Sequence, residues 1–205
     1  MRLPMFAAAV VGAVVLGTVP ASAAPTDDPT DPVPTDPPSV APVDPGLPTP
    51  VDPSASTPLS AQDSQFVTAA GYAGNFEVAG GSLAKARAQS EAVQEFGTRM
   101  ISDHNKAGTK LAQLAKANGM STPDLPDSAQ QNILNAWSRL DGLLFDCAYV
   151  PAEYLDHVGA VGLFENEAAH GDNADLVQFA RETLPTLQEH KRMITSALSA
   201  LDCNG

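Results

Sequence analysis

Three histidines and one glutamate could together bind a metal ion in this chain. They are Glu77, His104, His157 and His190. Each lies near the middle of a stretch with the periodicity of a long amphipathic helix, on or beside its apolar side. Imidazole nitrogens and carboxylate oxygens are ligands that zinc, copper and iron accept in proteins. The same four side chains could instead satisfy one another by hydrogen bonding in a helical core.

These four side chains should lie at one height if their helices pack side by side. Each falls roughly 12 to 17 positions into a helix of about 26 to 29 residues, so all should lie within about 6 Å of mid-height. Glu77 and His157 fall near the centres of their apolar stripes, whereas His104 and His190 lie about 45° to one side. Asp103 lies almost as close as His104 to the apolar stripe of their shared helix, on its other edge. Three interpretations stay open: a site for one Zn, Cu or Fe ion, a hydrogen-bonded or proton-sensitive network, and residues that do not meet.

An acidic residue directly precedes each of these three histidines. The acids are Asp103, Asp156 and Glu189. Neighbouring residues on a helix point about 100° apart, so such an acid cannot partner its own imidazole. It could instead serve a histidine of another helix.

Four stretches repeat apolar residues at every third or fourth position, which predicts four long helices and an all-α four-helix bundle. They span about residues 60–84, 90–117, 145–170 and 173–201. Gly80 and Gly81 weaken the first prediction, because each glycine costs about 1 kcal/mol relative to alanine in a helix.

The roughly 27 residues between the second and third helices exceed what a hairpin turn needs. They include a short amphipathic piece with Ile133, Trp137, Leu140 and Leu144. We therefore expect a crossover that holds a short extra helix, and the up-down-down-up helix order of ferritin-like bundles.

Two cysteines test the pairing of the last two helices. Cys147 lies at the start of the third helix and Cys203 just beyond the fourth. An antiparallel hairpin would bring both to the same end, and an exported protein meets oxidising conditions. We expect a disulfide between them, with free or intermolecular thiols as the alternative.

The beginning of the chain indicates export. Residues 1–23 have the basic start, apolar core and small-residue exit of a secretory signal peptide, with a retained signal anchor as the alternative. Residues 24–59 hold twelve of the 18 prolines and six aspartates, but no lysine, arginine or aromatic residue. This composition predicts a disordered linker, which serves as a spacer or binds a proline-recognising domain. Residues 60–205 then form the folded domain.

Composition narrows the possible functions. The net charge of −13 disfavours binding to nucleic acid or to anionic lipid. The sequence has no Gly-rich phosphate loop, no Gly-x-Ser-x-Gly and no His-Glu-x-x-His, so enzyme chemistry would need the four-residue cluster. We favour a secreted or cell-envelope binding module without a transmembrane segment after signal removal. The alternative is a non-catalytic structural or interaction protein that meets an envelope partner through its linker.

The chain also resembles a known family over about residues 60–201. The resemblance rests on short segments in all four predicted helices: Gly74-Asn75-Phe76-Glu77, Phe96-Gly97-Thr98-Arg99-Met100 before Asp103-His104, Phe145-Asp146 with Tyr149, His157 and Phe164, and Thr183-Leu184-Pro185 before His190. They resemble the exported bacterial family called domain of unknown function 4142, which is related to the ferritin-like superfamily. The resemblance implies a ferritin-like helical fold, an envelope or extracellular location and no established activity.

The resemblance does not extend to the di-iron chemistry of ferritin-like proteins. That chemistry needs Glu-x-x-His on two helices. The residues three positions before the clustered histidines are Ile101, Tyr154 and Leu187. The one match, Glu167 with His170, lies at the end of the third helix, where a histidine is favoured by the helix dipole.

Overall fold

The computed structural model describes residues 58–204 and contains five helices and no β-strand in that range. They are α1 (Ala61–Arg87), α2 (Glu91–Ala117), α3 (Ser128–Trp137), α4 (Gly142–His170) and α5 (Ala174–Ala200). The predicted all-α class is therefore confirmed. The expected signal peptide, residues 1–23, and residues 24–57 of the expected linker lie outside the described residues.

Polar side chains start three of these helices. The Ser60 side chain accepts a hydrogen bond from the backbone N–H of Asp63 at the start of α1. Asp127 and Gln130 form a reciprocal capping box at α3, and Asn173 accepts two backbone N–H groups at α5. Each cap satisfies N–H groups that have no partner inside the helix.

The boundary between α3 and α4 differs from the sequence pattern. α3 ends at Trp137, and α4 begins at Gly142, three residues before the predicted start. Leu144, assigned to the short helix by its spacing, lies in α4 and is 70% exposed. Leu140 lies in the turn and still packs against the core, so the apolar spacing continues across a break in the helix.

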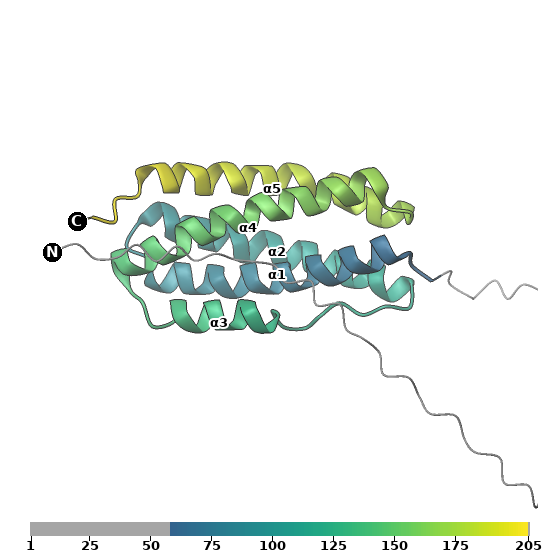
Figure 1. The fold of residues 1–205 in the computed structure, drawn as a ribbon, viewed down its shortest axis with the longest axis horizontal. Helices are drawn as coiled ribbons and strands as arrows, with labels where there is room; N and C mark the ends of the chain where they lie inside the picture. Colours follow the sequence, from purple (N-terminus) through teal and green to yellow (C-terminus); the bar gives the residue numbers. More distant parts are fainter. Residues whose placement is uncertain (1–57, 205) are drawn as a thin grey trace, which may run out of the picture. The chain divides into compact units, whose positions relative to one another are not determined.

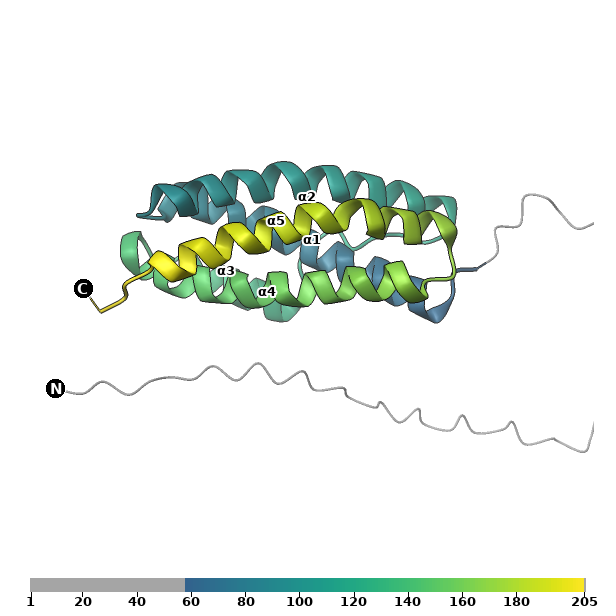
Figure 2. The same cartoon turned by 90° about the horizontal axis from the view of Figure 1, so that it is seen from above.

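The four long helices lie alongside one another. α1 contacts α2 and α4, and α5 contacts α4 and α2. Figure 1 shows α2 and α4 running in the same direction, joined through the connection that contains α3. Seen from above, α5 lies between α2 and α4 (Figure 2). α3 packs on the outside against α1 and α4.

Buried carboxylates hold the two helix–helix turns. Asp146 of α4 accepts the backbone N–H groups of Gln89 and Ser90, in the turn between α1 and α2. Asp63 of α1 accepts the backbone N–H of Asn173, in the turn between α4 and α5. Both aspartates are 1–2% exposed. Each turn is therefore fixed by a side chain from the opposite helix pair, which sets the relative height of the two pairs.

Two hydrophobic clusters form the core, one toward each end of the helices. One contains Phe66, Leu111, Phe164 and Phe179, and the other contains Phe96, Phe145 and Tyr149. On α2, α4 and α5 the residues of the two clusters are separated along the chain by His104, His157 and His190, respectively. The histidine layer therefore interrupts an otherwise apolar interior.

Glycines allow α1 and α2 to approach closely. A Cβ added at Gly97 would lie 2.6 Å from the carbonyl oxygen of Gly81 and 2.8 Å from the Cβ of Ala84. A Cβ added at Gly81 would meet the Gly97 carbonyl at the same 2.6 Å. Gly80 and Gly81, which weakened the prediction of the first helix, lie within α1. Gly81 is tolerated there because only a glycine permits this close contact with α2.

We expect Gly97→Ala to destabilise the domain by about 1–3 kcal/mol, because the added methyl group overpacks a contact with backbone. The matched control is Gly159→Ala on the exposed face of α4, where an added Cβ meets nothing within 4 Å. That control should gain about 0.5–1 kcal/mol from helix propensity. Urea denaturation of both variants measures the difference. Equal effects of the two substitutions would contradict the close approach.

The two cysteines lie at disulfide distance. The Cα atoms of Cys147 and Cys203 are 5.9 Å apart, within the range that a disulfide spans. Cys147 belongs to α4 and Cys203 follows α5. The antiparallel pairing of these helices therefore brings the cysteines together. Among residues 58–204, no helix combines the length and hydrophobicity that a membrane crossing requires.

Candidate metal centre

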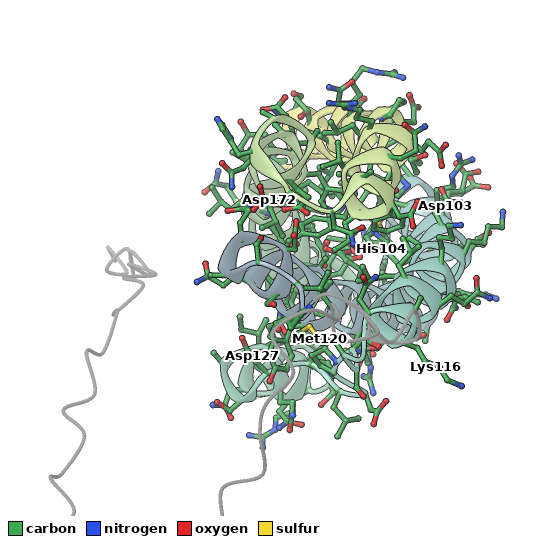
Figure 3. The ribbon with its side chains drawn as sticks, turned by 90° about the vertical axis from the view of Figure 1, so that its right-hand side faces the viewer. Asp103, His104, Lys116, Met120, Asp127 and Asp172 are labelled. Carbon is green, nitrogen blue, oxygen red and sulfur yellow. A yellow bond between two sulfur atoms is a disulfide. The ribbon has the colours of Figure 1, made fainter. Side chains whose placement is uncertain are left out.

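Three histidines from three helices meet in the interior. His104 of α2, His157 of α4 and His190 of α5 each offer one ring nitrogen, and these nitrogens lie within 4.8 Å of one another. Their ring centroids are 5.5–6.3 Å apart. His157 and His190 are each 1% exposed. His104 is half-buried, and its Nε2 is buried. In Figure 3, His104 lies in the space that the helices enclose.

Hydrogen bonds indicate which nitrogen carries the hydrogen in two of the three rings, those of His157 and His190. Nδ1 of His157 lies 3.0 Å from the backbone carbonyl of Glu153, and a carbonyl can only accept, so Nδ1 carries the hydrogen. Nε2 of His190 donates in the same way to the Asp103 carboxylate at 3.0 Å. The lone pairs therefore reside on Nε2 of His157 and Nδ1 of His190 in the neutral rings. Both of these atoms are buried without a hydrogen-bond partner among residues 58–204, as is Nε2 of His104.

The surroundings keep the three rings neutral. Burial lowers the pKa of His104 to about 3, with repulsion from the other two histidines adding to the effect. Burial also lowers the pKa of His190 to about 4, although Asp103 partly offsets it. The pKa of His157 is lowered by burial as well. Neutral imidazole is the form that binds a metal ion.

Asp103 orients His190 from a different helix. Burial alone would raise the Asp103 pKa, but hydrogen bonds from His190 and Arg99 outweigh it and hold the pKa below its ordinary value. Arg99 lies one helical turn before Asp103 and forms an ion pair with it. Figure 3 shows Asp103 on the α5 side of α2. The prediction that an acid preceding one histidine can serve another is thus confirmed for Asp103.

Two buried glutamates form a second group around His157. Oε1 of Glu77 lies 3.8 Å from Nδ1 of His157, and Oε2 of Glu153 lies 3.7 Å from the same nitrogen. Glu77 is 1% exposed and Glu153 is fully buried. None of their four carboxyl oxygens has a hydrogen-bond partner within the described range, nor does the buried hydroxyl of Tyr149.

The two glutamates favour their protonated forms. Burial is the main cause that raises the pKa of Glu77 well above its ordinary value, and repulsion from Glu153 and Asp156 adds to it. Burial likewise raises the pKa of Glu153 to about 8. Two carboxylates so close together in the protein interior cannot both ionise at low cost. This side of His157 is therefore a neutral, proton-holding environment near pH 7.

Glu153→Gln should flatten the pH dependence of stability in the metal-free protein. The unfolded chain loses the Glu153 proton above about pH 4.5, whereas the folded protein keeps it up to about pH 8, so wild-type stability falls over that interval. Glutamine cannot ionise and removes this loss. At pH 8 we expect the free energy of unfolding of the variant to exceed that of the wild type by about 2 kcal/mol or more.

The measurement is urea denaturation at a series of pH values from 5 to 8. Glu165→Gln, on the exposed face of the same helix, is the matched control and should follow the wild type. The histidines have the opposite effect on the pH dependence of stability. Because their pKa values are lowered in the folded protein, the free energy of unfolding falls as the pH drops below about 6.5. A Glu153→Gln curve parallel to the wild type between pH 6.5 and 8 would refute the assignment.

A cavity of about 270 Å³ adjoins two of the three histidines. Residues from all four long helices line it, and His104, His190 and Glu77 belong to its wall. An ion held by the histidines would therefore lie next to open space.

The structure separates the predicted four-residue set into two groups that share His157. His104, His157 and His190 form one, and Glu77 joins the other. The sequence interpretation missed Glu153, although Tyr149, Glu153 and His157 follow one another at four-residue spacing on one face of α4. That spacing is the signal that could have revealed Glu153. His170 is exposed at the end of α4, away from both groups, as expected.

Comparison with known proteins gives one family. A family model described as "Domain of unknown function (DUF4142)" matches residues 48–197, which is most of the chain. No curated protein and no solved structure matches the chain. The matched residues include both groups of the candidate centre.

Proposed function

The chain belongs to the DUF4142 family, and we propose that its helical domain binds one transition-metal ion through His104, His157 and His190. The proposed ligand atoms are Nε2 of His104, Nε2 of His157 and Nδ1 of His190. Zinc, copper and iron all accept a set of three neutral imidazoles. Such a set leaves one position free for water or another small ligand.

The observation that carries the proposal is that each of the three histidines offers one ring nitrogen within 4.8 Å of the others and has one buried ring nitrogen without a hydrogen-bond partner among residues 58–204. A hydrogen-bonded network would pair such atoms, because a buried polar atom without a partner costs about 1–3 kcal/mol. Here the hydrogen bonds lie on the far sides of the rings and turn the lone pairs of His157 and His190 inward. Metal-bound histidines in proteins usually have this arrangement.

The spacing of the nitrogens suits an ion after small ring movements. A tetrahedral zinc ion lies about 2.0–2.1 Å from each nitrogen, which places the nitrogens about 3.4 Å apart. The structure places one nitrogen of each ring within 4.8 Å of the others. Rotation of the rings about their side-chain bonds would adjust the nitrogens to an ion.

Within the proposal the bundle is ferritin-like, with its helices in the up-down-down-up order. The shared direction of α2 and α4 and the long connection through α3 support that order (Figure 1). The ion site is of a different type from a di-iron centre, because its three histidines lack the Glu-x-x-His spacing. We assign ion binding to this site and no reaction.

We further propose that the protein is exported, with residues 1–23 as signal peptide and residues 24–59 as a linker. The cysteine pair at disulfide distance is compatible with an oxidising, extracytoplasmic location. The linker would then bind a partner in the cell envelope.

Elemental analysis tests the proposed ion binding. Untagged protein is stripped with a chelator, incubated with Zn²⁺, Cu²⁺ or Fe²⁺ in separate samples and dialysed. We expect one ion per chain for at least one of these metals. Metal contents far below one ion per chain in all three samples would contradict the proposal.

A further inference from the structure

The second buried group offers oxygen atoms on the other side of the His157 ring. The four carboxyl oxygens of Glu77 and Glu153 are buried without a hydrogen-bond partner among residues 58–204, and so is the hydroxyl of Tyr149. One oxygen of each glutamate lies within 4.8 Å of the other and of a His157 nitrogen. Nδ1 of His157, which faces the glutamates, already donates to a backbone carbonyl. The atoms left without a partner on this side are therefore all oxygens.

No positively charged side chain balances the two carboxyl groups. Within the described part of the chain, neither Glu77 nor Glu153 forms an ion pair with a lysine or an arginine. Carboxylates in a protein interior are normally paired or bound to a metal ion. One divalent cation carries a charge equal and opposite to that of two carboxylates, so it would leave the interior neutral.

The adjoining cavity also favours a cation. Its wall contains Glu77 together with three aspartates, and none of the described lysines or arginines lines it. Asp103 is paired with Arg99, but Asp124 and Asp156 have no ion-pair partner among the described residues. An acidic wall attracts positive ions and repels negative ones. Glu77 therefore places the buried group beside a space in which cations are favoured.

We infer that Glu77 and Glu153 bind a second ion, a divalent cation of the kind that prefers oxygen ligands, such as Mg²⁺ or Mn²⁺. Carboxylate oxygens suit these ions, whereas imidazole nitrogens suit zinc, copper and iron. The hydroxyl of Tyr149, one helical turn before Glu153 on the same face of α4, is a further oxygen ligand. Two protons leave the carboxyl groups as the ion enters.

This site goes beyond the proposed function, because its ligands and its class of ion are different. The two glutamates come from α1 and α4, and neither is followed by a histidine at the third position, so the group also lacks the di-iron spacing. The ring of His157 separates this site from the three-histidine site.

Trp137 gives the second site its own signal, because it is the only tryptophan of the chain. A Cβ placed on Gly80 would lie 3.2 Å from the Trp137 ring and 3.2 Å from Oε1 of Glu153, so the indole lies beside the carboxyl group. Paramagnetic Mn²⁺ bound there should quench the fluorescence of Trp137. Mg²⁺, which is diamagnetic, should displace Mn²⁺ and restore the fluorescence.

Titration of the zinc-loaded full protein with Mn²⁺ tests the inference. Electron paramagnetic resonance measures the free Mn²⁺, and we expect one bound Mn²⁺ per chain together with quenching of Trp137. Glu77→Gln and Glu153→Gln each remove one negative charge from the site. Each should weaken Mn²⁺ binding by about tenfold or more while zinc binding keeps its stoichiometry.

Glu167→Gln is the matched control. Glu167 is a fully buried glutamate of the same helix, but it lies 14 positions after Glu153, about 21 Å along the helix. The Glu167→Gln variant should bind Mn²⁺ as the wild type does. Circular dichroism of each variant checks that the helices are retained.

The outcomes separate this inference from the proposed function. If Mn²⁺ does not bind, or binds Glu153→Gln as tightly as the wild type, the inference is wrong and the three-histidine site is unaffected. Metal-free His190→Ala should still bind Mn²⁺ and quench Trp137; loss of Mn²⁺ from this variant but not from Glu153→Gln would place the ion at the histidines and overturn the inference. If zinc fails to bind, the proposed function is wrong, and titration of the metal-free protein with Mn²⁺ still decides the inference.

Discussion

His157→Ala should abolish stoichiometric metal binding and weaken the affinity for zinc by about 100-fold or more. His157 supplies one of the three proposed ligand nitrogens and is also the residue that joins the two buried groups. Its loss leaves two imidazoles, which hold a divalent ion poorly in competition with water. Equilibrium titration against a zinc-binding dye measures the affinity. Circular dichroism on the same samples checks that the helices are retained.

The chain contains its own control for this experiment. Of its four histidines, only His170 lies outside the cluster, exposed at the end of α4. His170→Ala should therefore bind zinc as the wild type does. The account of the site fails if the two alanine variants bind zinc with equal affinity, or if His170→Ala is the weaker of the two.

Replacing both Cys147 and Cys203 with serine should lower the free energy of unfolding by about 4 kcal/mol. The two residues are 56 positions apart in the sequence, so a disulfide between them closes a long loop. Such a bond restricts the unfolded chain and thereby favours the folded state. Urea denaturation of the oxidised wild type and of the double variant measures the difference.

A reducing agent supplies the control for the cysteine experiment. It should destabilise the wild type to the level of the double serine variant and leave that variant unchanged. Mass spectrometry of a non-reduced digest should give one linked peptide that contains both cysteines. Two unlinked cysteine peptides would disprove the disulfide.

The helices could be predicted from the sequence because each carries a local signal. α2 begins after Ser90 and ends before Asn118 and Gly119, as its apolar spacing and end residues indicate. The break between α3 and α4 could not be predicted in this way, because Leu140 keeps its contact with the core across the turn. The close approach at Gly97 depends on a residue of another helix, so its own sequence neighbourhood does not reveal it.

The composition of the candidate site was predictable only in part. Helix position alone indicated that His104, His157 and His190 lie at one level. Helix position did not give the rotation of α2 about its axis accurately enough to choose between Asp103 and His104. In the structure Asp103 is the hydrogen-bond partner of His190, and His104 belongs to the histidine group. The direction of each lone pair depends on hydrogen bonds such as that from His157 to a backbone carbonyl, which helical spacing does not determine.

The cavity was likewise beyond the sequence interpretation. Small residues around Glu77 on α1, including Ala73 and Gly74, suggest room near the centre of the helices but do not show whether neighbouring side chains fill it. Whether they do depends on the packing of all four helices.

An anomalous-difference map from a crystal of the zinc-loaded protein, recorded at the zinc absorption edge, tests the proposed ion site most directly. We predict one strong peak within about 2.0–2.1 Å of Nε2 of His104, Nε2 of His157 and Nδ1 of His190. A peak between Glu77 and Glu153 alone, or no peak inside the bundle at saturating zinc, would contradict the three-histidine site.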